Sequence, residues 1–66
     1  MKAWEAIKKV NGQEIDVDTV FFNTDCDAQY VFDALVNHDG MDIDYVRNET
    51  GRKNGLITYA VWPEQD

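Results

Sequence analysis

The sequence contains few of the residues from which catalytic and disulfide-stabilised sites are built. Its 66 residues include one cysteine and one histidine, and serine is absent. A single cysteine forms no internal disulfide, which indicates a reducing compartment. Nucleophilic catalysis needs a nucleophile beside a base. Cys26 and His38 are expected near opposite ends of one helix, about 18 Å apart at 1.5 Å per residue. We therefore predict that the protein is not an enzyme and assign no catalytic residue.

Long apolar runs are also missing from the chain. No run reaches 18 apolar residues, and the first residues lack the apolar core of a signal peptide. The chain is accordingly predicted to be cytoplasmic, with no membrane contact. Its length fits a single domain, residues 1–66, with a thin core. A hydrophobic content of 44% favours a folded chain over a disordered one despite a net charge of −7.

Basic residues are absent from the stretch between Val10 and Val46. The same stretch holds nine acidic residues: Glu14, Asp16, Asp18, Asp25, Asp27, Asp33, Asp39, Asp42 and Asp44. Uncompensated charge of one sign repels itself and costs stability, so a binding role for these acids is favoured, with solubility as the alternative. The negative sign of the charge argues against direct nucleic-acid binding.

Three pairs of aspartates occur two residues apart: Asp16/Asp18, Asp25/Asp27 and Asp42/Asp44. A calcium loop of the EF-hand kind needs acids at positions 1, 3 and 5, glycine at 6 and glutamate at 12, and no segment supplies this pattern. On a strand, two such carboxylates are about 6.6 Å apart, which is too far for one ion to bridge easily. We therefore predict no metal site and no cofactor.

Turn signals and hydrophobic periodicity predict one helix between two pairs of strands. The helix is expected from Asp25 to about Asn37, with Thr24 capping its start and Gly40 following its end. The four strands are expected at residues 3–10, 13–22, 42–48 and 56–62. Asn11-Gly12 is typical of a type I′ hairpin turn, and polar residues 49–55 form the second turn. The order β-β-α-β-β favours a two-layer α+β domain, an antiparallel sheet with the helix packed on one face.

The second predicted strand alternates between apolar and acidic residues. Its expected core face, opposite Trp4, consists of Ile15, Val17, Thr19 and Phe21. Glu14, Asp16 and Asp18 then form a row on the other face, at a spacing of about 6.6–6.8 Å. Acids on the helix and third strand extend this row into an array that resembles DNA phosphates and attracts a basic nucleic-acid groove. The alternative is that the acids are scattered over several faces.

Residues 4–47 show a pattern known from one family of small phage proteins. Trp4…Ala6, a hairpin, Ile15-Asp16-Val17, a short helix and Asp39-Gly40-Met41-Asp42-Ile43-Asp44-Tyr45-Val46-Arg47 together resemble the T7-type phage inhibitor of bacterial RNA polymerase. The resemblance implies an acidic phage protein in the host cytoplasm that lodges between the polymerase jaw and the DNA channel. It also implies a role for arginines on the strand after the helix. Arg47 matches one of these arginines, and Tyr45 stands at the position of the other.

The predicted function is inhibition of a host nucleic-acid-processing enzyme through its basic nucleic-acid-binding surface. Bacterial RNA polymerase is the first candidate target, followed by defence nucleases and repair enzymes. The residues assigned to partner binding are Glu14, Asp16, Asp18, Asp25, Asp27, Asp33, Asp42, Asp44 and Arg47. The alternative is a non-enzymatic assembly module that forms a homodimer through an exposed strand edge.

Overall fold

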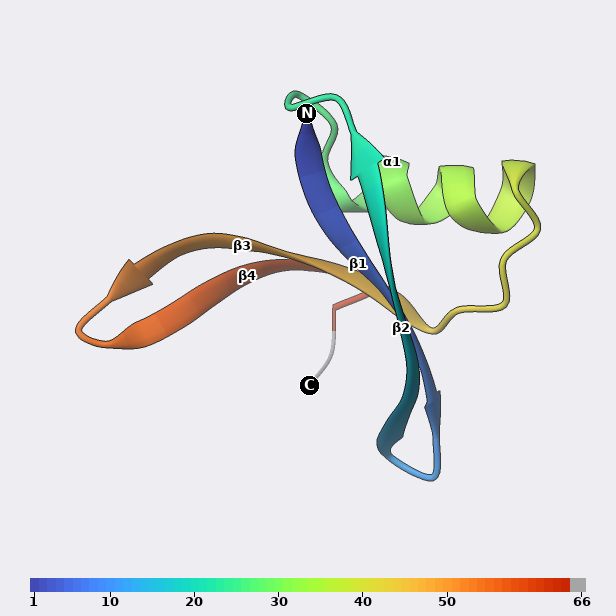
Figure 1. Ribbon diagram of the computed structural model, residues 1–66, viewed down its shortest axis with the longest axis horizontal. Helices are drawn as coiled ribbons and strands as arrows, with labels where there is room; N and C mark the ends of the chain where they lie inside the picture. The colour runs from blue at the N-terminus through green and yellow to red at the C-terminus, as the bar shows by residue number, and fades with distance from the viewer. Residues whose placement is uncertain (65–66) are drawn as a thin grey trace.

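The computed structural model describes residues 1–64. The chain folds into two hairpins and one helical segment. Along the chain the elements are β1 (Lys2–Val10), β2 (Gln13–Phe22), α1 (Ala28–Asp33), the π-helical turn η1 (Ala34–His38), β3 (Tyr45–Lys53) and β4 (Leu56–Trp62). The strands form one antiparallel sheet in the order β2-β1-β3-β4, with the helix on one face (Figure 1). The predicted α+β fold is therefore confirmed.

Both hairpins close through an Asn-Gly pair. Asn11 and Gly12 have φ angles of 53° and 77°, and Asn54 and Gly55 have 53° and 80°. Positive φ at both central residues is what a type I′ turn requires, and it matches the twist of the flanking strands. The second turn is shorter than the predicted polar turn at 49–55, because β3 continues to Lys53.

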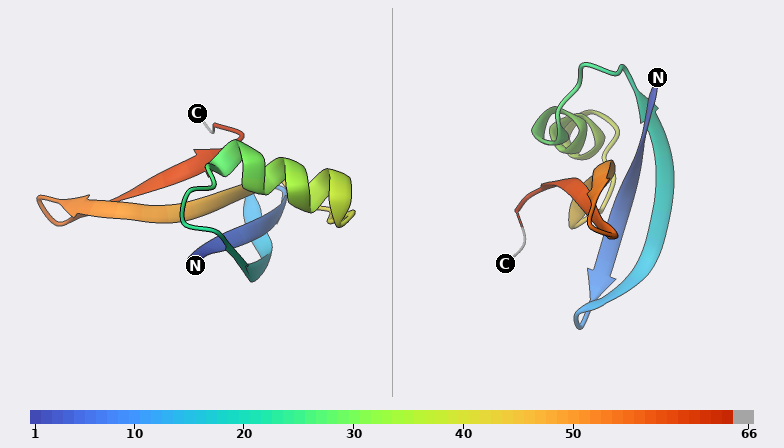
Figure 2. Two further views of the ribbon diagram at one scale, coloured as in Figure 1. Left: turned by 90° about the horizontal axis from the view of Figure 1, so that it is seen from above. Right: turned by 90° about the vertical axis from the view of Figure 1, so that its left-hand side faces the viewer.

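The two hairpins meet over a short junction. β1 and β3 pair at three positions only: Glu5 with Arg47, Ala6 with Val46, and Ile7 with Tyr45. Beyond the junction the hairpins cross and diverge (Figures 1 and 2). Residues 49–59, the outer part of β3 and β4, project from the body as a two-stranded ribbon, which we call the arm.

The core lies where the helix packs on this junction. Five side chains form it, each 2% exposed or less: Trp4, Ala6, Val31, Leu35 and Val46. Val20 and Phe22 of β2 and Trp62 of β4 are partly buried around them. Strands and helix thus join through a small apolar cluster, as expected for a chain of this length.

A β-bulge at Ile15 changes which side chains of β2 face the core. Lys9 pairs with Glu14 and Lys8 with Asp16, so Ile15 has no partner on β1. One extra residue turns every later side chain to the other face of the sheet. Trp4 therefore lies opposite Val20 and not Thr19. The predicted core face of this strand was wrong: Ile15, Val17, Thr19 and Phe21 are exposed, and Phe21 is 63% exposed.

The helix begins three residues later than predicted. Asp27 is its N-cap, because the Asp27 Oδ1 accepts a hydrogen bond from the Tyr30 backbone N–H at 2.8 Å. Thr24, the predicted cap, lies in the preceding turn. Gly40 follows the helical segment with a φ of +69°, as predicted. Neither helical segment within residues 1–64 combines the length and the apolar character needed to cross a membrane.

Candidate partner-binding surface

The residues predicted to bind a partner lie on different faces of the molecule. Asp16 and Asp18 pair with Lys8 and Ala6 of β1 and lie on the helix side of the sheet. Glu14 precedes the bulge and reaches Tyr45 and Arg47 on the face of the sheet opposite to the helix. The prediction that Glu14 continues the row of Asp16 and Asp18 was therefore wrong, because the bulge separates them. The other predicted residues lie around the helix start (Asp25, Asp27), on the helix (Asp33), before β3 (Asp42, Asp44) and on β3 (Arg47).

Arg47 is held between two carboxylates on the face of the sheet opposite to the helix. Its Nη1 lies 2.8 Å from the Glu14 Oε2, and its Nε and Nη2 lie 3.2 and 3.3 Å from the two Glu5 oxygens. The guanidinium also stacks 5.9 Å from the Tyr59 ring centroid. The side chains of all four strands meet here, so this network ties the two hairpins together. The assignment of Arg47 and Glu14 to a partner stays a prediction that requires these internal contacts to exchange.

The same network makes the thermal stability of the fold depend on the protonation of Glu14. The hydrogen bond donated by the Tyr45 hydroxyl, together with the adjacent Arg47 guanidinium, lowers the pKa of Glu14 below its ordinary 4.5. A carboxylate with a lower pKa in the folded state stabilises the fold above its unfolded pKa, and that contribution disappears as the pH falls through the folded value. We expect the melting temperature of the wild type to fall more steeply than that of Glu14→Gln as the pH is lowered through this range.

Glu64→Gln serves as the control for this titration, because Glu64 is exposed and has no ion pair within residues 1–64. Its pH profile should follow the wild type. Parallel profiles for the wild type and Glu14→Gln in circular-dichroism melts would show that Glu14 does not make the Tyr45 and Arg47 contacts in solution.

Three further acids of the predicted set act on the protein's own groups. The Asp44 Oδ2 accepts a hydrogen bond from the Lys9 backbone N–H at 2.6 Å, and the Asp44 N–H donates to the Ile7 carbonyl at 2.7 Å. Asp42 forms an ion pair with Lys8, and the hydrogen bond to Asp42 raises the pKa of Lys8. Asp27 caps the helix. These contacts fix the loop before β3 and the start of α1, which is a structural role.

The remaining four acids of the set, Asp16, Asp18, Asp25 and Asp33, are exposed, and their side chains make no hydrogen bond or ion pair with any residue that the structure describes. Asp16 and Asp18 border a shallow hollow of about 300 Å³ together with Asp42, Met41 and Ile43. Lys8 also lines it, but its charge is already paired with Asp42. We call the three carboxylates Asp16, Asp18 and Asp42 the acidic hollow.

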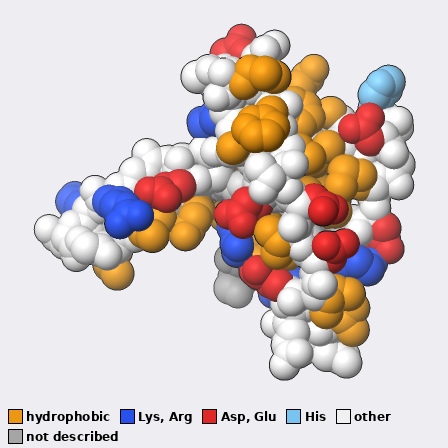
Figure 3. Space-filling model, in the orientation of Figure 1, with side chains coloured by type: hydrophobic (Ala, Val, Ile, Leu, Met, Phe, Trp, Pro, Cys, Tyr) orange, Lys and Arg blue, Asp and Glu red, His pale blue; other side chains and the backbone are white. Residues whose placement is uncertain are grey.

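Acidic side chains gather where the two hairpins cross, and the basic side chains of the arm lie at its outer end (Figure 3). Arg52 and Lys53 occupy that outer end of β3. No three histidine, cysteine, aspartate or glutamate side chains within residues 1–64 are arranged to hold a metal ion.

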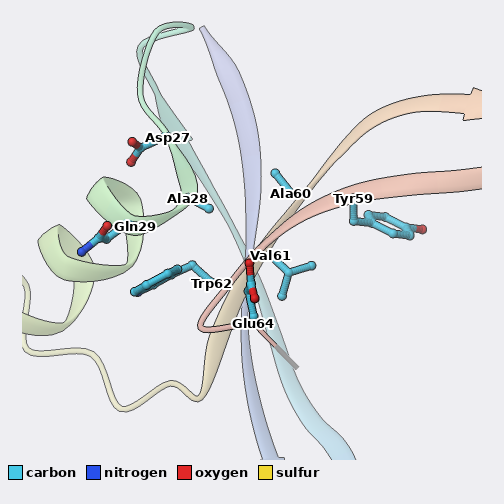
Figure 4. Close-up of a pocket in the computed structure, with 8 residues that line it drawn as sticks. All are labelled: Asp27, Ala28, Gln29, Tyr59, Ala60, Val61, Trp62 and Glu64. Carbon is cyan, nitrogen blue, oxygen red and sulfur yellow. The ribbon is translucent and has the colours of Figure 1, made fainter. Parts of the chain in front are cut away.

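An open groove of about 630 Å³ between the helix start and β4 was not predicted from the sequence. Its lining joins residues 27–29 to residues 59–62 and Glu64 (Figure 4). Trp62 extends from β4 toward the first turn of α1, while Asp27 and Glu64 supply carboxylates. We call it the α1–β4 groove. The only sequence signal for it is that β4, Leu56–Trp62, contains no charged residue.

Comparison of the chain with protein-family models finds no match, and comparisons with curated proteins and with solved structures find none either.

Proposed function

We propose that this protein is a non-enzymatic binding protein whose acidic hollow docks on the basic nucleic-acid-binding surface of another protein and blocks it. The observation that carries the proposal is that the carboxylates of Asp16 and Asp18, on the helix face of β2, are exposed and make no hydrogen bond or ion pair within residues 1–64.

The arrangement of these two carboxylates suits a row of cationic side chains. Alternate residues of a strand point to the same face about 6.6–6.8 Å apart, so Asp16 and Asp18 present two negative charges in a line. Asp42 lies across the hollow from them. A groove lined by lysine and arginine complements this pattern, and charge complementarity mainly accelerates association and sets specificity. Binding also relieves the self-repulsion of a chain with net charge −7.

The proposed target is a nucleic-acid-processing enzyme of a bacterial host, and the proposed location is the host cytoplasm. Bacterial RNA polymerase is the first enzyme to test, because the sequence pattern of residues 4–47 resembles its phage inhibitor. Asp25 and Asp33 are exposed and are proposed to extend the contact. Glu14, Asp27, Asp44 and Arg47 contribute only if their internal contacts exchange on binding.

The test reverses both carboxylates, as Asp16→Lys with Asp18→Lys, and measures affinity for RNA polymerase by surface plasmon resonance. We expect the variant to bind at least about tenfold more weakly and to lose much of its salt dependence, because the removed contacts are screened by ions. Double-stranded DNA should compete with the wild type for the enzyme.

The matched control is Glu49→Lys with Asp66→Lys, which makes the same change in net charge elsewhere. Glu49 lies on the arm, and Asp66 lies outside the described residues. Circular dichroism establishes that each variant is folded. Two results would overturn the proposed role of the acidic hollow. One is an affinity that changes neither with salt nor with the Asp16/Asp18 reversal, and the other is an equal loss of affinity in the control variant.

A further inference from the structure

The two edges of the sheet differ in how well they are protected against pairing with another strand. β2 carries Glu14, Asp16 and Asp18 and is interrupted by the bulge at Ile15. Charges and bulges of this kind are the usual devices that keep an edge strand from pairing. β4 has no charged residue, no proline and no unpaired residue from Leu56 to Trp62, since the irregularity in its ladder lies on β3 between Glu49 and Gly51. The β4 edge is therefore the one open to another strand.

The arm also exposes apolar side chains that the body does not cover. Leu56 is 72% exposed and Tyr59 is 48% exposed, and Ile57 lies between them in the strand sequence, also exposed. A two-stranded ribbon in water is only marginally stable by itself, whereas a third strand or a packed face stabilises it. A strand added along β4 would be that third strand, and its side chains would pack on the exposed apolar residues of the arm.

The charges of the arm and of the α1–β4 groove are complementary. The outer end of the arm carries Lys53 and Arg52, and Arg52 also forms an ion pair with Glu49 at 3.2 Å. The groove carries Asp27 and Glu64 on its walls, with Ala28, Ala60 and Trp62 between them. One chain thus carries both the arm, with basic and apolar side chains, and the α1–β4 groove, with acidic and apolar side chains. Both lie beside the exposed edge of β4.

We propose that two copies of this chain associate through antiparallel pairing of β4 with β4 of the second copy, so that each arm end enters the α1–β4 groove of the other. β4 is centred on Tyr59, and a two-fold axis there sets Leu56 opposite Trp62 of the second copy. Side chains two residues apart share a face, so Leu56, Thr58, Ala60 and Trp62 point to the same side of the extended sheet. Leu56 then enters the groove beside Trp62, and Lys53, its neighbour on β3, approaches Glu64.

A second copy is the occupant that the observations favour, because an isologous contact needs both complementary features on one chain, and this chain has them. The dimer uses the edge opposite to the acidic hollow, since β2 and β4 are the two ends of the sheet. Asp16→Lys with Asp18→Lys should therefore leave the dimer intact, and failure of one proposal says nothing about the other.

The experiment is sedimentation velocity of the full chain from about 1 μM to about 1 mM, the range in which weak dimers dissociate. We expect a reversible dimer in the wild type and an increase of at least about tenfold in its dissociation constant in Leu56→Glu. This change removes the apolar insertion and places a carboxylate beside Asp27 and Glu64.

Ile15→Glu is the matched control, since Ile15 is an exposed apolar residue on the other edge strand. It should leave the dimer unchanged. A second readout avoids mutation: backbone amides of β4 should gain protection from hydrogen exchange as the wild-type concentration rises. A monomer at every concentration, or a dimer that dissociates in Ile15→Glu and persists in Leu56→Glu, would overturn the proposal.

Discussion

Replacing Trp4 with alanine is expected to remove most of the stability of the fold. Trp4 is 1% exposed and belongs to the cluster that joins β1 and β3 to the helix. Truncating a buried tryptophan costs about 3–5 kcal/mol, since both the apolar transfer energy and the cavity count against the fold. A domain of this size has a free energy of unfolding of about 3–10 kcal/mol. Urea titration followed by tryptophan fluorescence and circular dichroism measures the loss.

Two neighbouring phenylalanines supply the control for this prediction. Phe21 is 63% exposed, so Phe21→Ala should change the free energy of unfolding by less than about 0.5 kcal/mol. Phe22 packs against the core and contacts the Tyr30 ring edge-on at 6.3 Å between centroids, so Phe22→Ala should cost clearly more. The reverse order would mean that β2 presents its other face to the core.

Deleting Ile15 is expected to leave the fold intact, although deletions inside strands usually abolish folding. Ile15 is the unpaired residue of the bulge, so its removal gives a regular ladder in which Lys9 still faces Glu14 and Lys8 still faces Asp16. No side chain changes face. We expect a melting curve that remains cooperative, with a loss of about 1 kcal/mol or less.

Deleting Glu5 from β1 is the contrasting variant and should unfold the protein. β1 pairs with β2 on one side and β3 on the other, so its alternation cannot shift independently. Removing one residue places either Trp4 or Ala6 on the wrong face of the sheet. Circular dichroism and the dispersion of amide proton signals distinguish the two variants. Unfolding in both would indicate that the bulge residue is needed for a reason other than register.

Local signals in the sequence were enough to predict most of the elements. Asn11-Gly12 and Gly40 require positive φ, and the β-forming residues of β4 mark that strand from Leu56 to Trp62. The bulge could not be predicted, because β2 has apolar residues on both faces and either register buries some of them. The extension of β3 to Lys53 was missed because residues 49–53 are polar, and they form a strand only through pairing with β4.

The candidate site was predictable in its charge but not in its geometry. An excess of acid between Val10 and Val46 is visible in the sequence. Which acids are engaged depends on contacts between residues far apart in the chain, such as Arg47 with Glu5 and Glu14. Those contacts form only after the two hairpins meet. The separation of Glu14 from Asp16 and Asp18 likewise depends on one unpaired residue.

The short junction between the hairpins also determines where folding loses the most chain entropy. Each hairpin closes a two-residue loop, but joining Ile7 to Tyr45 closes the whole segment from residue 8 to residue 44. Closing a flexible loop of that length costs about 3 kcal/mol by the logarithmic dependence on loop length. Three residue pairs and the helix contacts must offset this cost together. The helix therefore stabilises the joined state of the two hairpins, together with the ion pairs of Arg47 with Glu5 and Glu14.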